Sequence, residues 1–219
     1  MAPSLLRPGL HFCLVGDDPI FLDLVTGRYF RLPDQQAQAF CALVATGLVD
    51  RTALLAAGLG ELAGAASDPL PLEPCRWSLP DQPCGALADG GLPLPETARA
   101  LRRQRHFERA LARRGLAALC DELAALTAKA VSRPIGSDDA AGRLVRGFQF
   151  ACFLRTAADR CLPRSLALVD LLARCGWRAH AVLGVRQGPF AAHCWAQAGR
   201  MVLNDTPEAV ACFIPILAL

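Results

Sequence analysis

Three short segments near the C-terminal end decide what this chain can form: CLPRSL at residues 161–166, AHCW at 192–195 and MVLND at 201–205. The first begins an amphipathic helix, because apolar residues recur at helical spacing after Pro163, which a first helical turn tolerates. The second lies inside a strand-like run, and the third closes another. In chain order the segments supply a cysteine, a histidine and an aspartate.

These three residue types together make a thiol nucleophile, its general base and the group that orients the base. Only the thiolate attacks a carbonyl, and a free cysteine with a pKa of about 8.5 is mostly protonated at neutral pH. A helix N-terminus and a neighbouring imidazole lower a thiol pKa to roughly 3.5–7.5. Since Cys161 opens a helix, we predict Cys161 as the nucleophile, His193 as the base and Asp205 as the orienting carboxylate.

The pattern after Cys161 predicts a helix followed by a hairpin. The helix ends at Gly176, as a left-handed C-cap would. Apolar and β-branched residues then fill 177–185 and 190–197, with a turn around residues 187–189 between them. Side chains alternate along a strand, so we expect His193 to face the helix.

The same alternation places Trp195 beside His193 and turns Cys194 to the opposite face. A third predicted strand follows Gly199 and carries Asp205 at its end. There its carboxylate can accept a hydrogen bond from the imidazole.

Other candidates fit the three roles less well. Cys152 lies mid-helix on an apolar stripe, and Cys175 lies at a helix end without a downstream partner. His180 is in the strand before the turn, between two alanines. Asp170 is inside the helix that Cys161 opens, about 2.5 turns further on, and points elsewhere.

The stretch from about Phe148 to Leu219 resembles the transglutaminase-like, papain-related leader peptidase of lasso-peptide biosynthesis. The matching segments are CLPRSLAL at 161–168, LGV at 183–185, PFAAHCW at 189–195 and LND at 203–205. Intervals of 32 and 12 residues between the three catalytic candidates also suit that family. Cys194 is a departure, since such proteins more often carry a small residue there.

The resemblance implies a cysteine endopeptidase that cuts a ribosomal precursor peptide between leader and core, without a cofactor or a metal. It also implies a partner, an ATP-dependent, asparagine-synthetase-like cyclase that closes the macrolactam. Papain-like enzymes often place an oxyanion-hole glutamine before the cysteine, but Arg155 and Thr156 occupy that region here, with Gln149 further back. The backbone N–H of Cys161 is the one donor that we name.

The first 65 residues predict a separate unit of three strands followed by helices. The strands are expected at His11–Val15, Ile20–Leu24 and Arg28–Leu32, with Gly27 supplying positive φ to the second turn. Helices are expected from Pro33–Asp34 to Ala45 and, capped by Asp50, from Arg51 to about Ala57.

The segment LDLVTGRYFRL at 22–32 resembles the peptide-recognition element of the PqqD type, a winged-helix module. In that family a leader peptide adds as a strand to the sheet edge. The candidate peptide-binding residues are Arg28, Tyr29, Phe30, Arg31 and Leu32. A DNA-binding winged helix is disfavoured because Arg51 is the only Lys or Arg between Asp34 and Ala66. An inert structural cap is the other alternative.

These patterns predict an α+β chain with a recognition module at residues 1–66, a Pro- and Gly-rich linker at 67–95 and a peptidase domain with a helical beginning at 96–219. Seven arginines crowd the helix after Glu96, which Gly115 is expected to kink. This face either docks an acidic partner or precursor peptide, or is a solvated helix surface. Ser137 with the following aspartates begins another helix.

Composition narrows the class further. The chain has 219 residues, 53% of them hydrophobic, and a net charge of +3, which is too mild to imply nucleic acid. We expect a cytoplasmic protein without membrane insertion, because no signal peptide is evident and the apolar run at 209–219 is too short to span a bilayer. Its ten cysteines include no C-x-x-C pair, so neither disulfides nor a zinc site is expected.

Six of these thiols are expected to be mostly small core residues. They are Cys13, Cys41, Cys120, Cys152, Cys175 and Cys212.

Two other functions remain open for the same sequence. A transglutaminase-type acyl transferase would form the same thioester and pass it to an amine instead of water. A non-catalytic peptide chaperone would keep the binding module without using the thiol.

Overall fold

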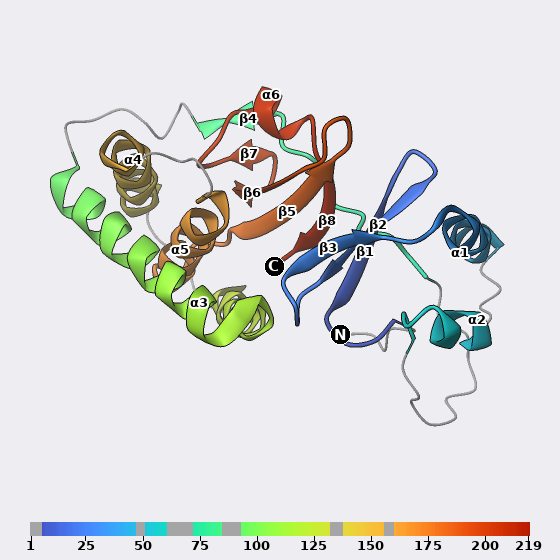
Figure 1. Ribbon diagram of the computed structural model, residues 1–219. Coiled ribbons are helices and arrows are strands. Elements are labelled where there is room, and N and C mark those ends of the chain that lie inside the picture. The colour runs from blue at the N-terminus through green and yellow to red at the C-terminus, as the bar shows by residue number, and fades with distance from the viewer. Residues whose placement is uncertain (1–5, 47–50, 61–71, 85–92, 132–137, 156–159) are drawn as a thin grey trace. The chain divides into compact units, whose positions relative to one another are not determined.

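The computed structural model describes residues 6–46, 51–60, 72–84, 93–131, 138–155 and 160–219 (Figure 1). The chain divides into two compact units, Met1–Arg76 and Trp77–Leu219. Both helices and strands are present, which confirms the predicted α+β class. None of the helices in these ranges combines the length and the apolar character needed to cross a membrane.

The N-terminal unit contains a three-stranded antiparallel sheet in the order β1-β2-β3. The strands are β1 (Leu10–Val15), β2 (Asp18–Asp23) and β3 (Arg28–Arg31). Gly27 adopts φ 66° in the turn before β3, as predicted. The Asp23 carboxylate stabilises this turn by accepting hydrogen bonds from Arg7, at 2.9 Å, and from the Val25 N–H, at 2.9 Å.

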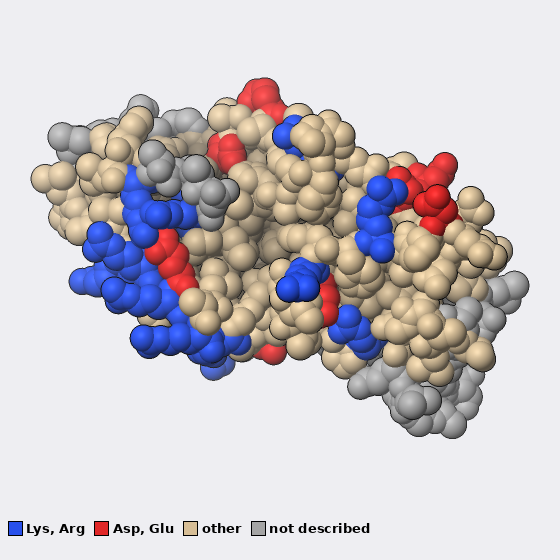
Figure 2. Space-filling model, in the orientation of Figure 1, with Lys and Arg blue, Asp and Glu red and all other residues tan. Residues whose placement is uncertain are grey.

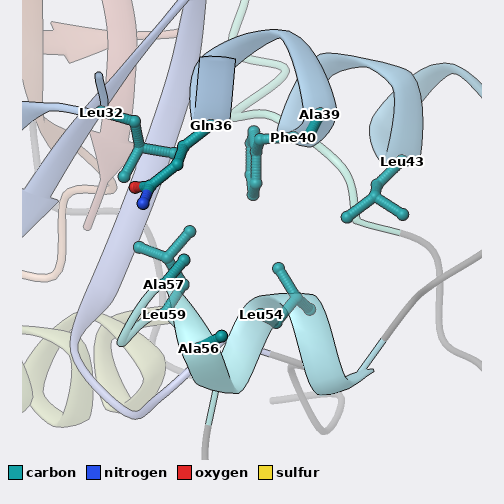
Figure 3. A pocket seen from close by; sticks show the side chains of 9 residues that line it. All are labelled: Leu32, Gln36, Ala39, Phe40, Leu43, Leu54, Ala56, Ala57 and Leu59. Atoms are coloured by element: carbon teal, nitrogen blue, oxygen red, sulfur yellow. The ribbon is translucent and has the colours of Figure 1, made fainter. Parts of the chain in front are cut away.

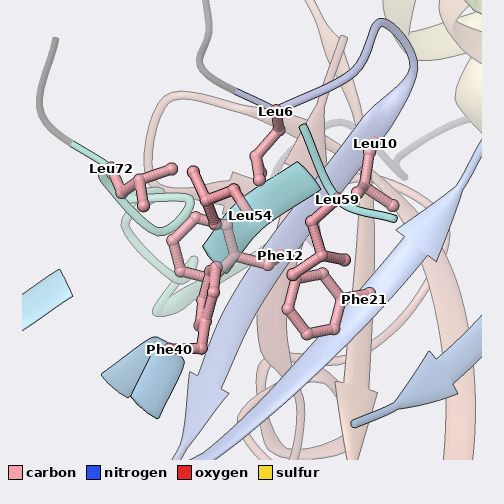
Figure 4. Close-up of a cluster of buried hydrophobic side chains, with 8 residues drawn as sticks. All are labelled: Leu6, Leu10, Phe12, Phe21, Phe40, Leu54, Leu59 and Leu72. Atoms are coloured by element: carbon pink, nitrogen blue, oxygen red, sulfur yellow. The ribbon is translucent and has the colours of Figure 1, made fainter. Parts of the chain in front are cut away.

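Two helices follow the sheet, α1 (Asp34–Thr46) and α2 (Arg51–Ala56), close to the predicted bounds. Asp50, the predicted cap of α2, lies outside the described residues. Three phenylalanines form the centre of the core, with the Phe40 ring packed edge-on to Phe12 and Phe21 at centroid distances of 5.0 Å. Figure 4 shows leucines completing this cluster, including Leu72 from beyond residue 66.

The C-terminal unit is built on a five-stranded sheet in the order β4-β7-β6-β5-β8. Its strands are β4 (Gln82–Pro83), β5 (His180–Arg186), β6 (Ala191–Ala198), β7 (Met201–Val202) and β8 (Ile214–Ala218). β5 and β6 form the predicted antiparallel hairpin, and β7 is the predicted third strand. β4 pairs with β7 in the parallel direction.

Four helices complete this unit: α3 (Leu94–Val131), α4 (Asp138–Leu154), α5 (Cys161–Arg174) and α6 (Pro207–Val210). Gly115 interrupts α3 with φ 78°, which confirms the predicted kink. α5 begins at Cys161 as predicted, and Gly176 beyond its end adopts φ 85°. Ser137 lies outside the described residues, although α4 begins directly after it.

Helix α5 is the centre of the C-terminal unit. It packs against α3 and α4 on one side and against β5 and β6 on the other (Figure 1). Its side chains from Ser165 to Ala173 are buried, and Leu166, Leu168 and Leu172 have no exposed surface. Because close packing holds α5 on both sides, it also fixes the position of Cys161, the first residue of the helix.

One buried carboxylate ties α5 to α3. Arg103 binds both oxygens of Asp170 at 2.8 Å, and Arg174 adds a further contact at 3.0 Å. Two guanidinium groups therefore neutralise a carboxylate whose side chain is only 4% exposed. Asp170 points away from the catalytic candidates, as predicted.

Part of the predicted linker packs against the C-terminal sheet. The Trp77 ring lies 4.7 Å from that of His180, and the Gln197 amide donates to the Ser78 carbonyl at 2.8 Å. Asp81 forms an ion pair with Arg200. In the N-terminal unit, the Cys75 N–H donates to the Phe12 carbonyl at 3.3 Å. The division into a recognition module at 1–66, a linker at 67–95 and a peptidase domain at 96–219 stays a prediction.

The expectation that six cysteines are mostly core residues is wrong. Cys13 and Cys120 are buried, Cys41, Cys152 and Cys175 are half-buried, and Cys212 is exposed. A thiol is small enough to be accommodated at partly exposed positions, so hydrophobicity alone does not place it in a core.

Candidate active site

The structure brings the three catalytic candidates together from three elements. Cys161 is the first residue of α5, His193 lies in β6, and Asp205 follows β7. The His193 Nε2 atom lies 2.6 Å from Asp205 Oδ2, and the Cys161 thiol is hydrogen-bonded to the His193 ring. Because Nε2 faces the carboxylate, Nδ1 is the ring nitrogen that faces the thiol.

A chain of buried hydrogen bonds holds the helix, the strand and the loop in register. Ser165 Oγ donates to the Cys194 carbonyl, and the Asn204 amide donates to Ser165 Oγ, each at 2.8 Å. The Ala196 N–H in turn donates to the Asn204 side-chain oxygen at 2.8 Å. Each bond joins an element that carries one catalytic candidate to an element that carries another. Ser165 and Asn204 thus hold the three elements that carry the catalytic candidates in position.

Aromatic rings fix the orientation of the His193 imidazole. Trp195 lies at a centroid distance of 6.2 Å with nearly parallel planes, as the alternation predicted, and Phe213 lies at 5.1 Å. Gly184, the strand partner of His193, lies close beneath these rings. A Cβ atom at Gly184 would come within 2.8 Å of Trp195 and 3.0 Å of Phe213, so only glycine fits without displacing them.

The electrostatics of the site favour a thiolate beside an imidazolium. Burial raises the pKa of the Cys161 thiol, but the hydrogen bond and charge of His193 and the N–H groups of Cys194 and Leu162 bring it below its usual value. Burial likewise lowers the pKa of His193, yet hydrogen bonds with Asp205 and Cys161 raise it to about 9. Below pH 9 the His193 imidazole therefore carries a proton. The Cys161 thiolate forms at a lower pH than that at which an ordinary thiol ionises.

Asp205 remains ionised despite its partial burial. Burial raises its pKa, but the hydrogen bonds from His193 and from the Thr206 N–H lower it below the ordinary value. An ionised carboxylate on Nε2 fixes the tautomer that directs Nδ1 to the thiol.

A cavity of about 400 Å³ opens at the three residues. It is lined by Cys161, Arg164, Ala192, His193, Cys194, Asn204 and Asp205. Arg164 was not predicted as a site residue, although a residue three positions after Cys161 lies on the same helix face. Its buried Nε atom has no hydrogen-bond partner within the described residues. Arg164 therefore lines the same cavity as the candidate nucleophile, and its charge helps to lower the pKa of Asp205.

The first turn of α5 offers backbone donors. Arg160 occupies the N-cap position and makes no side-chain capping bond in the described residues. The Cys161 N–H is thus consistent with its predicted role as an oxyanion donor. Gln149 and Arg155 do not line the cavity. Arg155 instead binds Glu108 at 2.9 Å. Thr156 lies outside the described residues.

The competing candidates lie in other environments. His180 Nδ1 lies 3.2 Å from the Leu219 carbonyl, and Cys175 caps the C-terminal end of α5. Cys152 is half-buried, and burial raises its pKa, while the charge of Arg164 lowers it and that of Asp205 raises it. Its thiol donates to the Phe148 carbonyl at 3.1 Å.

Four of the five predicted peptide-binding residues, from Arg28 to Arg31, form β3, which pairs only with β2 in the described part of the unit. Arg28 and Arg31 are exposed, and Arg31 pairs with Asp18 at 2.8 Å. Phe30 instead stacks on Phe21 at 5.1 Å, so its side chain packs into the core. Tyr29 lies on the opposite face of the strand, since side chains alternate.

Leu32, directly after β3, lines an apolar pocket of about 230 Å³ in the same unit. Figure 3 shows that α1 supplies Gln36, Ala39, Phe40 and Leu43 on one side, while α2 and the segment after it supply Leu54, Ala56, Ala57 and Leu59 on the other.

Alkylation of Cys161 by iodoacetamide is expected to remain fast at pH 7 and to slow at least roughly tenfold in His193→Ala. Without the imidazole, burial dominates and raises the thiol pKa, and one pKa unit changes the thiolate population about tenfold. Peptide mapping by mass spectrometry separates Cys161 from the exposed Cys212, which serves as the internal control. Equal alkylation rates in parent and variant would show that His193 does not activate the thiol.

Two comparisons with known proteins match parts of the chain. A family model described as the transglutaminase-like superfamily matches residues 100–218, which include all three catalytic candidates. The microcin J25-processing protein McjB of Escherichia coli is 45% identical over 48 residues, which are 22% of this chain and 23% of that protein. The match thus covers less than a quarter of that relative. No solved structure matches the chain.

Proposed function

The chain belongs to the transglutaminase-like superfamily, and from this premise we propose that its C-terminal unit is a cysteine endopeptidase which separates leader from core in a lasso-peptide precursor. The observation that carries the proposal is the hydrogen-bonded set of Cys161, His193 and Asp205 beside an open cavity. The short match to a microcin J25-processing protein agrees with the lasso-type resemblance of the sequence motifs.

The proposed reaction has two acyl-transfer steps. The Cys161 thiolate attacks the carbonyl carbon of the scissile peptide bond, and N–H groups such as that of Cys161 stabilise the oxyanion. His193 gives its Nδ1 proton to the leaving amine, which is the new N-terminus of the core, and the leader remains as a thioester. His193 then takes a proton from water, which attacks the thioester and releases the leader as a carboxylate. Asp205 stabilises the imidazolium in the stages in which His193 is protonated.

The N-terminal unit is proposed to hold the leader. The leader would add a strand to β3, so that backbone hydrogen bonds provide affinity, and the pocket beside Leu32 would take an apolar leader side chain. The freed core amine would pass to an asparagine-synthetase-like, ATP-dependent cyclase as the next partner. We place the reaction in the cytoplasm, where the precursor is translated and thiols stay reduced.

The mass of the products tests this function against acyl transfer. Precursor peptide is incubated with the protein in the presence of a primary amine such as glycine amide. A leader that ends in a free carboxylate supports the peptidase, whereas a leader that carries the amine supports a transglutaminase-type transferase. Intact precursor, bound but not cleaved after the cyclase is also added, would favour a peptide chaperone.

Binding of a labelled leader peptide is expected to be retained by a fragment of residues 1–76. This fragment extends beyond the predicted boundary at 66, because Leu72 and Cys75 contact the N-terminal core. Its deletion is expected to raise the KM for full-length precursor strongly, since a tether gives an effective concentration on the order of millimolar. The measurement is a fluorescence anisotropy titration. A folded fragment without saturable binding would leave the N-terminal unit without this role.

A further inference from the structure

We propose that an exposed arginine stripe on α3 is a docking surface for an acidic segment of a partner polypeptide. The stripe consists of Arg99, Arg102, Arg105, His106, Arg109 and Arg113. All six side chains are exposed, and helical spacing places them on one face. In Figure 2, blue side chains gather at the left of the view, over the helix labelled α3 in Figure 1.

Among the residues that the structure describes in this unit, none neutralises the charge of the stripe. No carboxylate of the described residues forms an ion pair with any of its five arginines. The two acidic residues of this half of α3 are bound elsewhere, since Glu96 pairs with Arg143, and Glu108 pairs with Arg155 and lies near Arg160. Neighbouring like charges repel one another, so an acidic ligand would relieve an existing strain.

The surface is hollowed where α3 meets α5. A cavity of about 410 Å³ is lined by Arg99, Arg102, Arg103, His106, Leu171 and Arg174. Arg103 and Arg174 are held in place by Asp170, whose single charge leaves this cavity with a surplus of positive charge. The N–H groups of these two guanidinium groups that Asp170 does not use are held in place, so they bind a carboxylate with less loss of conformational entropy than flexible side chains do.

The extent of the stripe favours a polypeptide over a small anion. From Arg99 to Arg113 the helix rises about 21 Å, at about 1.5 Å per residue, whereas a phosphate group would fill only the cavity at one end. An extended or helical segment with several Asp or Glu side chains matches both the row of arginines and the cavity. The stripe would bind such a segment whichever acyl acceptor the Cys161 site uses.

Binding of a fluorescein-labelled ten-glutamate peptide to the full chain tests the proposal. We expect saturable binding at low ionic strength that weakens toward about 150 mM salt, because exposed charges are screened. The Arg99→Glu/Arg102→Glu double variant should bind at least tenfold more weakly. Arg76→Glu, a charge reversal at an exposed arginine of the other unit, is the control and should bind within twofold of the parent.

Each other outcome counts against the docking surface. Equal peptide binding by the parent and the double variant would overturn it, as would absence of binding to the parent. Inorganic tripolyphosphate is the competing probe, and binding of tripolyphosphate without binding of the peptide would point to a phosphate site. Circular dichroism verifies that each variant is folded. If the charge-reversal variant is unfolded, Arg99→Ala/Arg102→Ala replaces it, and this variant is also expected to bind the peptide more weakly than the parent.

Discussion

The Cys161→Ala variant is expected to lose precursor cleavage by roughly 10⁴-fold or more while it binds the leader as the parent does. The loss follows because no other thiol in the described residues combines a lowered pKa with a hydrogen bond to an imidazole. Leader binding is proposed to use the N-terminal unit, Met1–Arg76, to which Cys161 does not belong. Cleavage is measured by mass spectrometry, and binding by titration of labelled leader.

Cys212→Ala is the matched control, since it removes an exposed thiol from the same unit. It should cleave at the parental rate. If Cys161→Ala still cleaves at near that rate, another residue is the nucleophile, and the geometry at the N-terminus of α5 has a different purpose.

The His193→Ala variant is expected to be nearly as inactive as Cys161→Ala, because the thiol then loses both its activation and its proton acceptor. Asp205→Asn should retain roughly tenfold to a hundredfold more activity than His193→Ala, since residues that act as a unit are not additive and the orienting group contributes less. Initial rates of cleavage give the comparison. His180→Ala, which alters a histidine bound to the Leu219 carbonyl, is the control and should remain active.

The pH profile distinguishes an orienting role of Asp205 from a structural one. The rate should rise with pH below 9 as the thiolate forms, and fall as His193 loses its proton near its pKa of about 9. Asp205 raises the pKa of His193, so Asp205→Asn should move the falling limb to lower pH. An unchanged rate and an unchanged profile in this variant would remove Asp205 from the site.

The sequence was informative where a residue type and a local pattern coincide. A cysteine at a helix start, a histidine in an alternating strand and an aspartate at a strand end each have a local signal, and these three residues meet in the structure. The kink at Gly115 and the turn at Gly27 follow from positive φ, which glycine adopts readily. The strands β1, β2 and β3 also have a local signal in the sequence, and their predicted bounds are close to those observed.

The features that escaped prediction depend on contacts between distant residues. β4 has only two residues in a proline-rich stretch and gains its pairing from β7, which follows more than a hundred positions later. β8 was read only as a short apolar run, although it pairs with β5. The place of Arg164 in the wall of the catalytic cavity, and the half-burial of Cys152, depend on how α4, α5 and the sheet pack.

The hydrogen bonds from Asn204 to Ser165 and from Ser165 to Cys194 have a consequence for the order of folding. They span 39 and 29 residues, so they form only after β6 and the loop beyond β7 have reached α5. Until then Cys161 has no imidazole beside it, and its thiol behaves as an ordinary cysteine in water. A nascent or partly unfolded chain therefore carries a dormant thiol, and reactivity begins only once the C-terminal unit is complete.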